Sequence, residues 1–315
     1  MTDLREMKRT IKGVGFSYPV MVGGGIVKTV DQIAKYASTE TTLEWGSITT
    51  EPKSGNGGRD YYAHYVDKYG RPTLAYALNS IGLTNPGIKH VQRHAADMIA
   101  RYRDNGKPLP INISGEGVDD TLTLMKQAID CGFPVISVNA ACPNKVGKDM
   151  KPVPVMCYDI DSMAELITRA DQEIRRGDTL IMLKVSTGLP VTTLRSICTL
   201  LKTSLVFEGL ITGNTVPNGF AFLSNGEPAI KTSNGVTVGG LSGPAIKPLS
   251  LSQTRFAADI LGGQKVVWGC GGAETAQDVR EYLQAGAMMV QIVTAFREHG
   301  ENPVFIRNLL EDLID

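Results

Sequence analysis

The stretch TLIMLKVS, residues 179–186, places four apolar residues in succession and then ends in a lysine and a serine around one valine. Continuous apolar runs, rather than alternating ones, are typical of parallel strands that are buried on both faces. Seven more stretches follow this pattern, at 19–25, 42–49, 109–115, 134–142, 207–215, 265–272 and 288–295. Helix-like segments such as DDTLTLMKQAIDCG (119–132) and ETAQDVREYLQAG (274–286) separate them, each with an acidic start and a glycine stop.

Strand, helix and glycine stop recur in eight units, which predicts a (β/α)8 barrel formed by a single domain, residues 1–315. Such barrels usually take about 250 residues. The excess falls in three long connections, roughly 50–86, 143–158 and 216–246. A doubly wound open sheet is the competing fold. It is disfavoured because there are eight units and because no G-x-G-x-x-G follows the first strand.

The amino-acid composition limits the binding partners and the cell compartment that we expect for the protein. The chain carries 32 basic and 32 acidic residues without a basic stripe, so we expect neither nucleic acid nor an anionic membrane surface as partner. The N-terminal stretch MTDLREMKRTIKGVGFSYPVM lacks the apolar core of a signal peptide. No apolar run approaches the roughly 20 residues that span a bilayer. Five scattered cysteines without a CxxC pair indicate reduced thiols, so we expect a cytoplasmic protein without a membrane anchor.

The strand ends predict where the chemistry lies, because barrel enzymes carry their catalytic residues at the C-terminal ends of the strands. Here those ends form a ring of amide, hydroxyl, thiol and ammonium groups with hardly a carboxylate. The ring consists of Gly23, Gly24, Gly25, Lys28, Ser47, Thr49, Asn112, Ser114, Asn139, Cys142, Lys184, Asn214, Thr215, Gly271, Gly272 and Thr294. It suits a planar, multiply hydrogen-bonding ligand better than a divalent cation. His90 and His94, on an expected helix, likewise indicate a solvated face rather than a metal site.

Two glycine-rich stretches, VGGLSGPAIKP (238–248) and GCGGAET (269–275), lie where barrels often bind phosphate. A helix expected to begin near Glu274 adds its N-terminal N–H groups, which favours a phosphate site over two simple tight turns. Lys184 is costly to bury unless it meets an anion or a negative dipole. It could form a Schiff base, stabilise the N1/O2 edge of a reduced flavin, or lie at the surface. With a phosphate site across the barrel mouth, flavin mononucleotide (FMN) fits best.

Six blocks in the same order resemble the dihydroorotate dehydrogenase family of FMN-dependent barrels, from about residue 10 to the C-terminus. They are NSIGLTNPG (79–87), NAACPNKVGK (139–148), GNTVPNG (213–219), VGGLSGPAIKP (238–248), GCGGAET (269–275) and MVQIVTA (289–295). The resemblance implies oxidation of dihydroorotate to orotate in pyrimidine biosynthesis. Cys142 would be the general base, which takes the proton from C5 while C6 gives hydride to flavin N5. A thiol in a polar, covered site can have its pKa lowered towards the working pH, whereas Cys131 and Cys198 are interpreted as packing residues.

The resemblance also implies the site residues and the partners. Substrate would be bound by Lys28, Asn79, Ile81, Gly82, Leu83, Asn139, Asn144, Asn214 and Thr215. FMN would be held by Gly23, Gly24, Ser47, Asn112, Asn139, Lys184, Ser242, Gly243, Gly271, Gly272 and Thr294. Residues 145–156 would form a lid that excludes water. We further expect a homodimer, a dihydropyrimidine substrate and an electron acceptor that the sequence does not identify.

One segment departs from the soluble branch of the family. That branch carries a lysine in a T-K-S-S segment, whereas EWGSITTEP (44–52) has Gly46 in its place. This version resembles the membrane-associated branch, whose lysine follows the first strand, as Lys28 does here, but that branch uses serine as its base. The acceptor therefore stays open among fumarate, oxygen, quinone and a partner protein.

Three alternative functions stay open. Residues 217–237 resemble the flavin domain of dihydropyrimidine dehydrogenase, so dihydrouracil or a specialised metabolite derived from a pyrimidine is an alternative substrate. A flavin-free Schiff-base lyase would use Lys184 on the same barrel. A non-catalytic flavin-binding protein would lose no rate when Cys142 is replaced by alanine.

Overall fold

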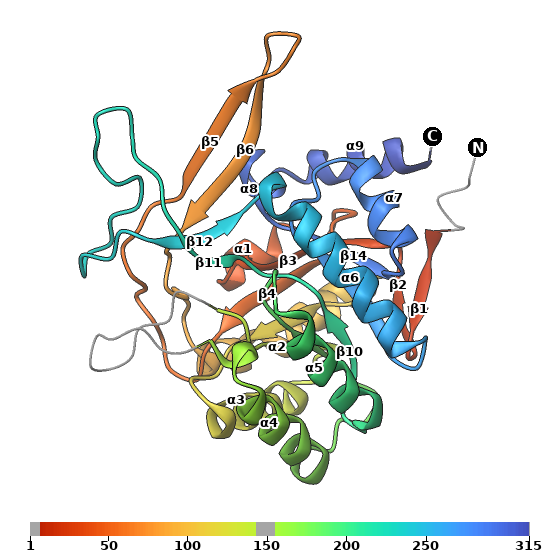
Figure 1. The fold of residues 1–315 in the computed structure, drawn as a ribbon. Helices are drawn as coiled ribbons and strands as arrows, with labels where there is room; N and C mark the ends of the chain where they lie inside the picture. Colours follow the sequence, from red (N-terminus) through yellow and green to blue (C-terminus); the bar gives the residue numbers. More distant parts are fainter. Residues whose placement is uncertain (1–6, 143–154, 315) are drawn as a thin grey trace.

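The computed structural model describes residues 7–142 and 155–314, and eight parallel strands form a closed barrel at its centre (Figure 1). In chain order the barrel strands are β3 (Val20–Val27), β4 (Leu43–Ile48), β7 (Pro110–Ile113), β8 (Val135–Asn139), β9 (Leu180–Lys184), β10 (Phe207–Ile211), β13 (Val266–Cys270) and β14 (Met289–Ile292). Each overlaps one of the eight stretches expected from the apolar runs. The predicted (β/α)8 barrel is therefore confirmed.

The barrel strands are buried on both faces, which explains their continuous apolar sequences. Every residue of β7, β8, β9 and β10 is buried. One face of each strand contacts the barrel interior and the other contacts the surrounding helices, so neither face needs polar residues. The polar residues of these strands therefore need partners inside the protein.

Helices surround the barrel and connect its strands (Figure 1). They are α1 (Val30–Ala34), α2 (Ile88–Asp104), α3 (Val118–Asp130), α4 (Ile160–Glu173), α5 (Val191–Thr203), α6 (Lys247–Leu261), α7 (Ala276–Gln284), α8 (Thr294–Glu298) and α9 (Pro303–Ile314), with short 3-10 turns η2 (Met156–Tyr158) and η3 (Pro244–Ile246). The expected helices at 119–132 and 274–286 are α3 and α7. None of the described helices combines the length and apolar character that a membrane span requires.

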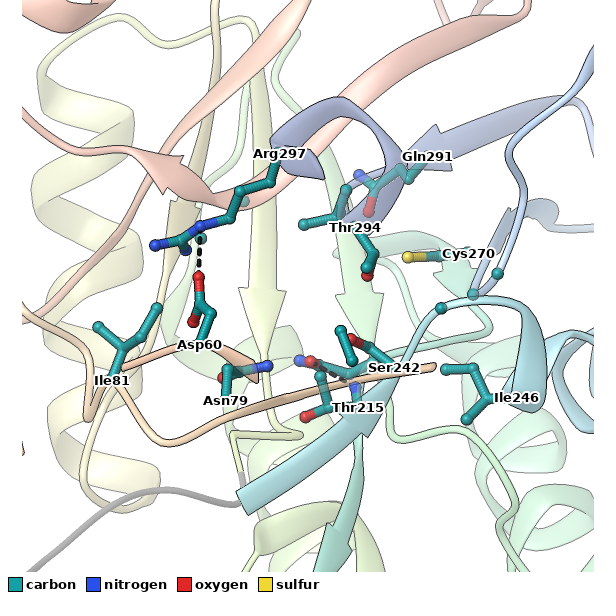
Figure 2. A pocket seen from close by; sticks show the side chains of 18 of the residues that line it. Asp60, Asn79, Ile81, Thr215, Ser242, Ile246, Cys270, Gln291, Thr294 and Arg297 are labelled. Atoms are coloured by element: carbon teal, nitrogen blue, oxygen red, sulfur yellow. Dashed lines mark hydrogen bonds and ion pairs between the residues drawn. The ribbon is translucent and has the colours of Figure 1, made fainter. Parts of the chain in front are cut away.

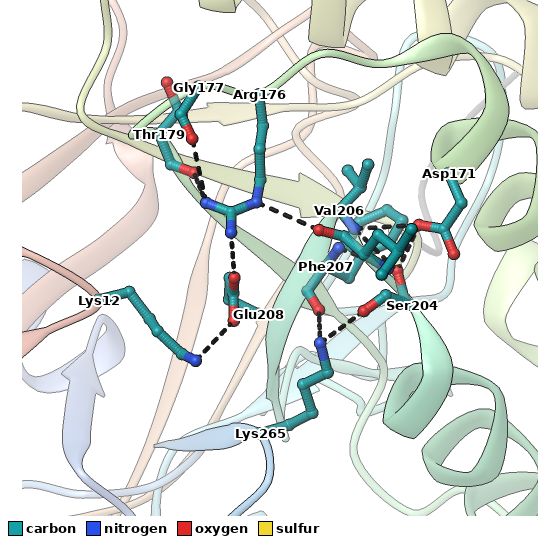
Figure 3. A network of polar contacts seen from close by, with 11 residues as sticks. Lys12, Asp171, Arg176, Gly177, Thr179, Ser204, Val206, Phe207, Glu208 and Lys265 are labelled. Atoms are coloured by element: carbon teal, nitrogen blue, oxygen red, sulfur yellow. Dashed lines mark hydrogen bonds and ion pairs between the residues drawn. The ribbon is translucent and has the colours of Figure 1, made fainter.

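A hairpin of β1 (Arg9–Ile11) and β2 (Val14–Phe16) covers the N-terminal end of the barrel. Phe16 packs edge-on against Trp268 with ring centroids 5.7 Å apart. At this end the buried carboxylate of Glu208 pairs with Lys12 at 3.3 Å and with Arg176 (Figure 3). The hairpin and these ion pairs close the end opposite to the expected active site.

A second, antiparallel sheet forms at the other end of the barrel, from connections that were not expected to contain strands. Its order is β11 (Val216–Gly219), β12 (Gly239–Ser242), β6 (Pro72–Asn79) and β5 (Tyr61–Val66). The β5–β6 hairpin projects from the body of the molecule (Figure 1). In the register of β12 with β6, Gly240 lies opposite Asn79. This pairing brings the connections after β4 and β10 together over the strand ends.

Candidate active site

One pocket lies between the C-terminal ends of the barrel strands and the second sheet (Figure 2). Most residues that the sequence assigned to substrate or cofactor line it. They are Gly24, Lys28, Ser47, Asn79, Ile81, Gly82, Leu83, Asn139, Cys142, Lys184, Asn214, Thr215, Ser242, Gly243, Gly271, Gly272 and Thr294. Gly23 and Asn112 lie behind this lining, next to Gln291 and Ser47 respectively. Asn144 and residues 145–154 of the expected lid lie outside the described residues.

Cys142 follows β8 and is 8% exposed, with its side chain on the pocket lining. Lys28, which follows β3, lines the same pocket. Burial lowers the pKa of Lys28 from 10.5 to about 8, an effect that negative charge at Cys142 and Asp60 opposes and Arg297 assists. Lys28 and Cys142 therefore lie close enough to sense each other's charge. A cation at Lys28 favours the thiolate of Cys142, because opposite charges stabilise each other.

A row of hydroxyl and amide groups crosses the pocket floor from β4 to β10. Ser47 Oγ donates to Asn112 Oδ1 at 2.5 Å and accepts from Asn139 Nδ2 at 3.2 Å. Asn214 Nδ2 donates to Asn139 Oδ1 at 3.0 Å, and Asn214 Oδ1 accepts the N–H of Thr215 at 2.8 Å. Each amide is oriented by its neighbour, so the row can offer fixed donors and acceptors to a cyclic amide. Asn112 takes part through Ser47 rather than on the pocket lining.

The pocket also carries charged side chains that sequence reasoning missed, namely Asp60, Arg297 and Glu274. Asp60 pairs with Arg297 Nε at 2.7 Å, as the dashed line in Figure 2 shows. Burial raises the pKa of Asp60, and burial with the neighbouring Glu298 raises the pKa of Glu274 to about 7. The expectation of hardly any carboxylate concerned the strand ends, and the pocket gains its carboxylates from other segments of the chain. Asp60 and Glu274 come from connections, where the strand pattern gives no signal.

Three residues of the pocket lining each have a buried side-chain oxygen without a hydrogen-bond partner within the described part of the chain. These oxygens are Asp60 Oδ1, Thr215 Oγ1 and Glu274 Oε1. Buried polar atoms are nearly always paired, by protein or by water. These oxygens therefore suit a donor such as a buried water.

The two glycine-rich loops meet at one end of the pocket. Gly272 and Gly243 have φ of +69° and +82°, and a Cβ at Gly272 would lie 2.6 Å from the carbonyl oxygen of Gly243. Only glycine fits there, and it leaves bare backbone facing the pocket. Asp278 caps the start of α7 by accepting the N–H groups of Glu274 and Thr275. These two N–H groups are therefore paired within the protein, so the bare backbone of the turn at 271–273 is the better candidate for the expected phosphate site.

Cys270 is a second thiol on the pocket lining, whereas Cys131, Cys198, His90 and His94 lie outside it. Cys198 is fully buried on α5, and burial raises the pKa of Cys131 to about 11 and that of Cys198 to about 12. His90 and His94 lie on α2 with their rings 4.9 Å apart. In residues 7–142 and 155–314, three or more His, Cys, Asp or Glu side chains nowhere gather as metal ligands would.

Comparisons with known proteins place the chain among dihydroorotate dehydrogenases. A family model described as dihydroorotate dehydrogenase matches residues 6–315. The chain is 26% identical over 312 residues to a dihydroorotate dehydrogenase (fumarate) of Trypanosoma cruzi, covering 95% of this chain and 90% of that protein. It is 28% identical over 255 residues to the catalytic subunit of a dihydroorotate dehydrogenase B (NAD(+)) of Bacillus pumilus, covering 78% and 74%.

A solved structure agrees with the fold. The crystal structure of the Eimeria tenella DHODH in complex with ferulenol matches with a TM-score of 0.76 at 21% identity, covering 99% of this chain and 86% of that one. At this identity the likeness concerns the fold alone.

Proposed function

The chain belongs to the dihydroorotate dehydrogenase family, and we propose that it oxidises dihydroorotate to orotate with FMN as cofactor and Cys142 as the base. It is an oxidoreductase that acts on a CH–CH bond in pyrimidine biosynthesis. The observation that carries the residue assignment is the joint placement of Cys142, Lys28 and the row of asparagines on one pocket. A thiol, a cation and oriented amides are what removal of a carbon-bound proton from a cyclic amide requires.

The pocket residues fit FMN by their chemistry. The bare backbone at Gly243 and Gly272 suits a phosphate, because backbone N–H groups bind anions and no side chain intervenes. Lys184 is 3% exposed on the pocket floor and suits the electron-rich edge of the ring. The carboxyl groups of Asp60 and Glu274, two residues of the pocket lining, suit hydroxyl groups of a sugar-like chain.

The proposed reaction removes a proton and a hydride from two neighbouring carbons of the substrate. Cys142 takes the proton from C5 of dihydroorotate, and Lys28 favours the thiolate that does so. When bound, FMN supplies the acceptor for the hydride that leaves C6. Asn139 and Asn214 hold the ring amides in place, since each is itself oriented by a hydrogen bond. Lys28 also replaces the lysine absent at position 46 as the cation for the substrate carboxylate.

The test is anaerobic titration of the FMN-loaded protein with dihydroorotate and, separately, with dihydrouracil. We expect dihydroorotate to bleach the flavin absorbance and dihydrouracil to leave it unchanged. Bleaching by dihydrouracil alone would refute the substrate assignment. A protein that never binds FMN would refute the cofactor assignment. Screening fumarate, oxygen, quinones and NAD(+) for reoxidation of the bleached protein then identifies the electron acceptor.

Two finer statements complete the proposal. The protein acts in the cytoplasm, which its five scattered cysteines without a CxxC pair favour. It forms a homodimer, which the exposed apolar residues Tyr65, Val66 and Tyr69 of the β5–β6 hairpin favour. Sedimentation of the FMN-loaded protein tests the dimer, and a monomer at micromolar concentration would refute it.

A further inference from the structure

A buried carboxylate lies inside the barrel, directly behind the pocket lining. Glu44 is the second residue of β4, is 1% exposed and is not on the pocket lining. Its Oε2 accepts the N–H of Gly24 at 2.6 Å and Asn112 Nδ2 at 3.0 Å. Its Oε1 accepts Gln291 Nε2 at 2.8 Å and the hydroxyl of Ser137. Four donors on four other strands thus converge on one group, whose two oxygens accept two hydrogen bonds each.

Gln291 links this carboxylate to Lys184, the lysine on the pocket floor. Lys184 Nζ donates to Gln291 Oε1 at 2.7 Å, while Gln291 Nε2 donates to Glu44. The amide can take only this orientation. An ammonium group has no acceptor and a carboxylate has no donor, so an inverted amide would lose both hydrogen bonds. Gln291 and Lys184 both line the pocket.

The neutral amide between the two charges has a physical consequence. A carboxylate in direct contact with Lys184 would cancel most of its charge, whereas an amide oxygen holds the ammonium in place and leaves its charge available to a ligand. A lysine has a flexible four-carbon stem, so its position depends on such an acceptor. The hydrogen bond that Gln291 Nε2 donates to Glu44 prevents the amide from turning its NH2 group towards the ammonium.

We propose that Glu44 is a positioning residue, which fixes Gln291 and through it holds the ammonium of Lys184 against the bound flavin. The inference rests on the proposed function, because it needs flavin above Lys184. Glu44 would thus affect the reduction potential of the flavin without contacting either the cofactor or the substrate. Gln291 lies between Glu44 and Lys184 and is likewise a positioning residue.

The sign of the change in flavin reduction potential tests the proposal. K184M removes the cation and should lower the potential, because reduced flavin carries more negative charge than oxidised flavin. If Glu44 acts through Lys184, E44Q and Q291M should lower it too. If Glu44 acted only as a nearby negative charge, E44Q would raise it. We expect reduced FMN to lose about tenfold more affinity than oxidised FMN in E44Q, which is about 30 mV for a two-electron couple.

The measurements are the midpoint potential of bound FMN and the Kd of oxidised FMN from fluorescence quenching, with circular dichroism of each variant. E44D keeps the carboxylate and should recover part of the shift. E208Q removes a buried carboxylate at the far end of the barrel and should leave the potential unchanged. In a K184M background, Q291M should add no further shift, because its effect passes through Lys184.

The outcomes separate this inference from the proposed function. A raised or unchanged potential in folded E44Q overturns the inference, while dihydroorotate still bleaches the wild type. If E44Q does not fold, Q291M decides: a lowered potential that vanishes in K184M supports the inference, and an unchanged potential overturns it. A wild type that binds no FMN overturns both.

Discussion

Replacing Lys28 with methionine should stabilise the folded protein while it abolishes substrate binding. Burial lowers the pKa of Lys28 from 10.5 to about 8. Each pKa unit corresponds to about 1.4 kcal/mol, so keeping this lysine charged in the folded state costs about 3 kcal/mol. The cost is fully present below pH 8, where Lys28 is charged in both states. It disappears as pH rises from 8 to 10.5, because the folded state releases its proton first. Methionine has similar length and no such cost.

The assay is urea unfolding of the FMN-free protein at pH 6.5 and at pH 10. We expect K28M to exceed the wild type by about 3 kcal/mol at pH 6.5 and by much less at pH 10. K89M, which replaces an exposed lysine of α2, is the control and should change little at either pH. The reasoning is refuted if K28M is no more stable than the wild type at pH 6.5, or if its advantage does not shrink with pH.

Three further predictions concern buried or crowded positions. G46A should lower the free energy of unfolding, measured by thermal unfolding, by at least about 3 kcal/mol. The φ of Gly46 is +133°, and a Cβ there would lie 2.2 Å from the carbonyl oxygen of Asn112. In the control G15A the added Cβ meets open space, so this variant should lose little stability. Burial lowers the pKa of Lys107 to about 8 as well, but its ammonium donates to three backbone carbonyls that methionine would leave unpaired. K107M should therefore destabilise by about 3 kcal/mol, the opposite sign to K28M; unchanged urea unfolding would contradict this. The pKa of Glu274 is raised from 4.5 to about 7, so the wild type loses stability as pH rises through this window. E274Q should therefore be more stable than the wild type at pH 8 and equally stable at pH 4. A difference in stability at pH 4 as large as that at pH 8 would refute this.

The barrel could be predicted because its strands obey a simple physical rule. Stretches such as TLIMLKVS need no polar face, so their continuous apolar pattern survives without knowledge of neighbours. The strand ends then placed Asn139, Cys142 and Lys184 on one mouth, since all strands run parallel. The same topology predicts that the glycine-rich stretches 238–248 and 269–275 lie at this end of the barrel.

The second sheet could not be predicted in this way. β5 reads YYAHYV and lies half-exposed or exposed along its length, so no core imposes a pattern on it. β11 and β12 have only four residues each and contain glycine. Their pairing depends on where the barrel places the two connections. The charged pair Asp60 and Arg297 is a product of that placement and joins residues far apart in the chain.

Two polar residues inside expected strands indicate an internal hydrogen-bond network. Glu44 is a charged residue in the middle of a stretch expected to be a buried strand, and Gln291 is a polar one in another. Both are costly to bury without partners, so each indicates a hydrogen-bond network inside the barrel. Their partners, however, lie on different strands, and only the closed barrel brings them together.

The most direct test of the account is the rate at which dihydroorotate reduces bound FMN in a single anaerobic turnover, in the wild type and in C142A. C131A, which removes a thiol away from the pocket, serves as the control. If the thiol at position 142 takes the proton, C142A should bind FMN normally and react about 10²–10⁴-fold more slowly. A C142A rate close to that of the wild type would contradict it.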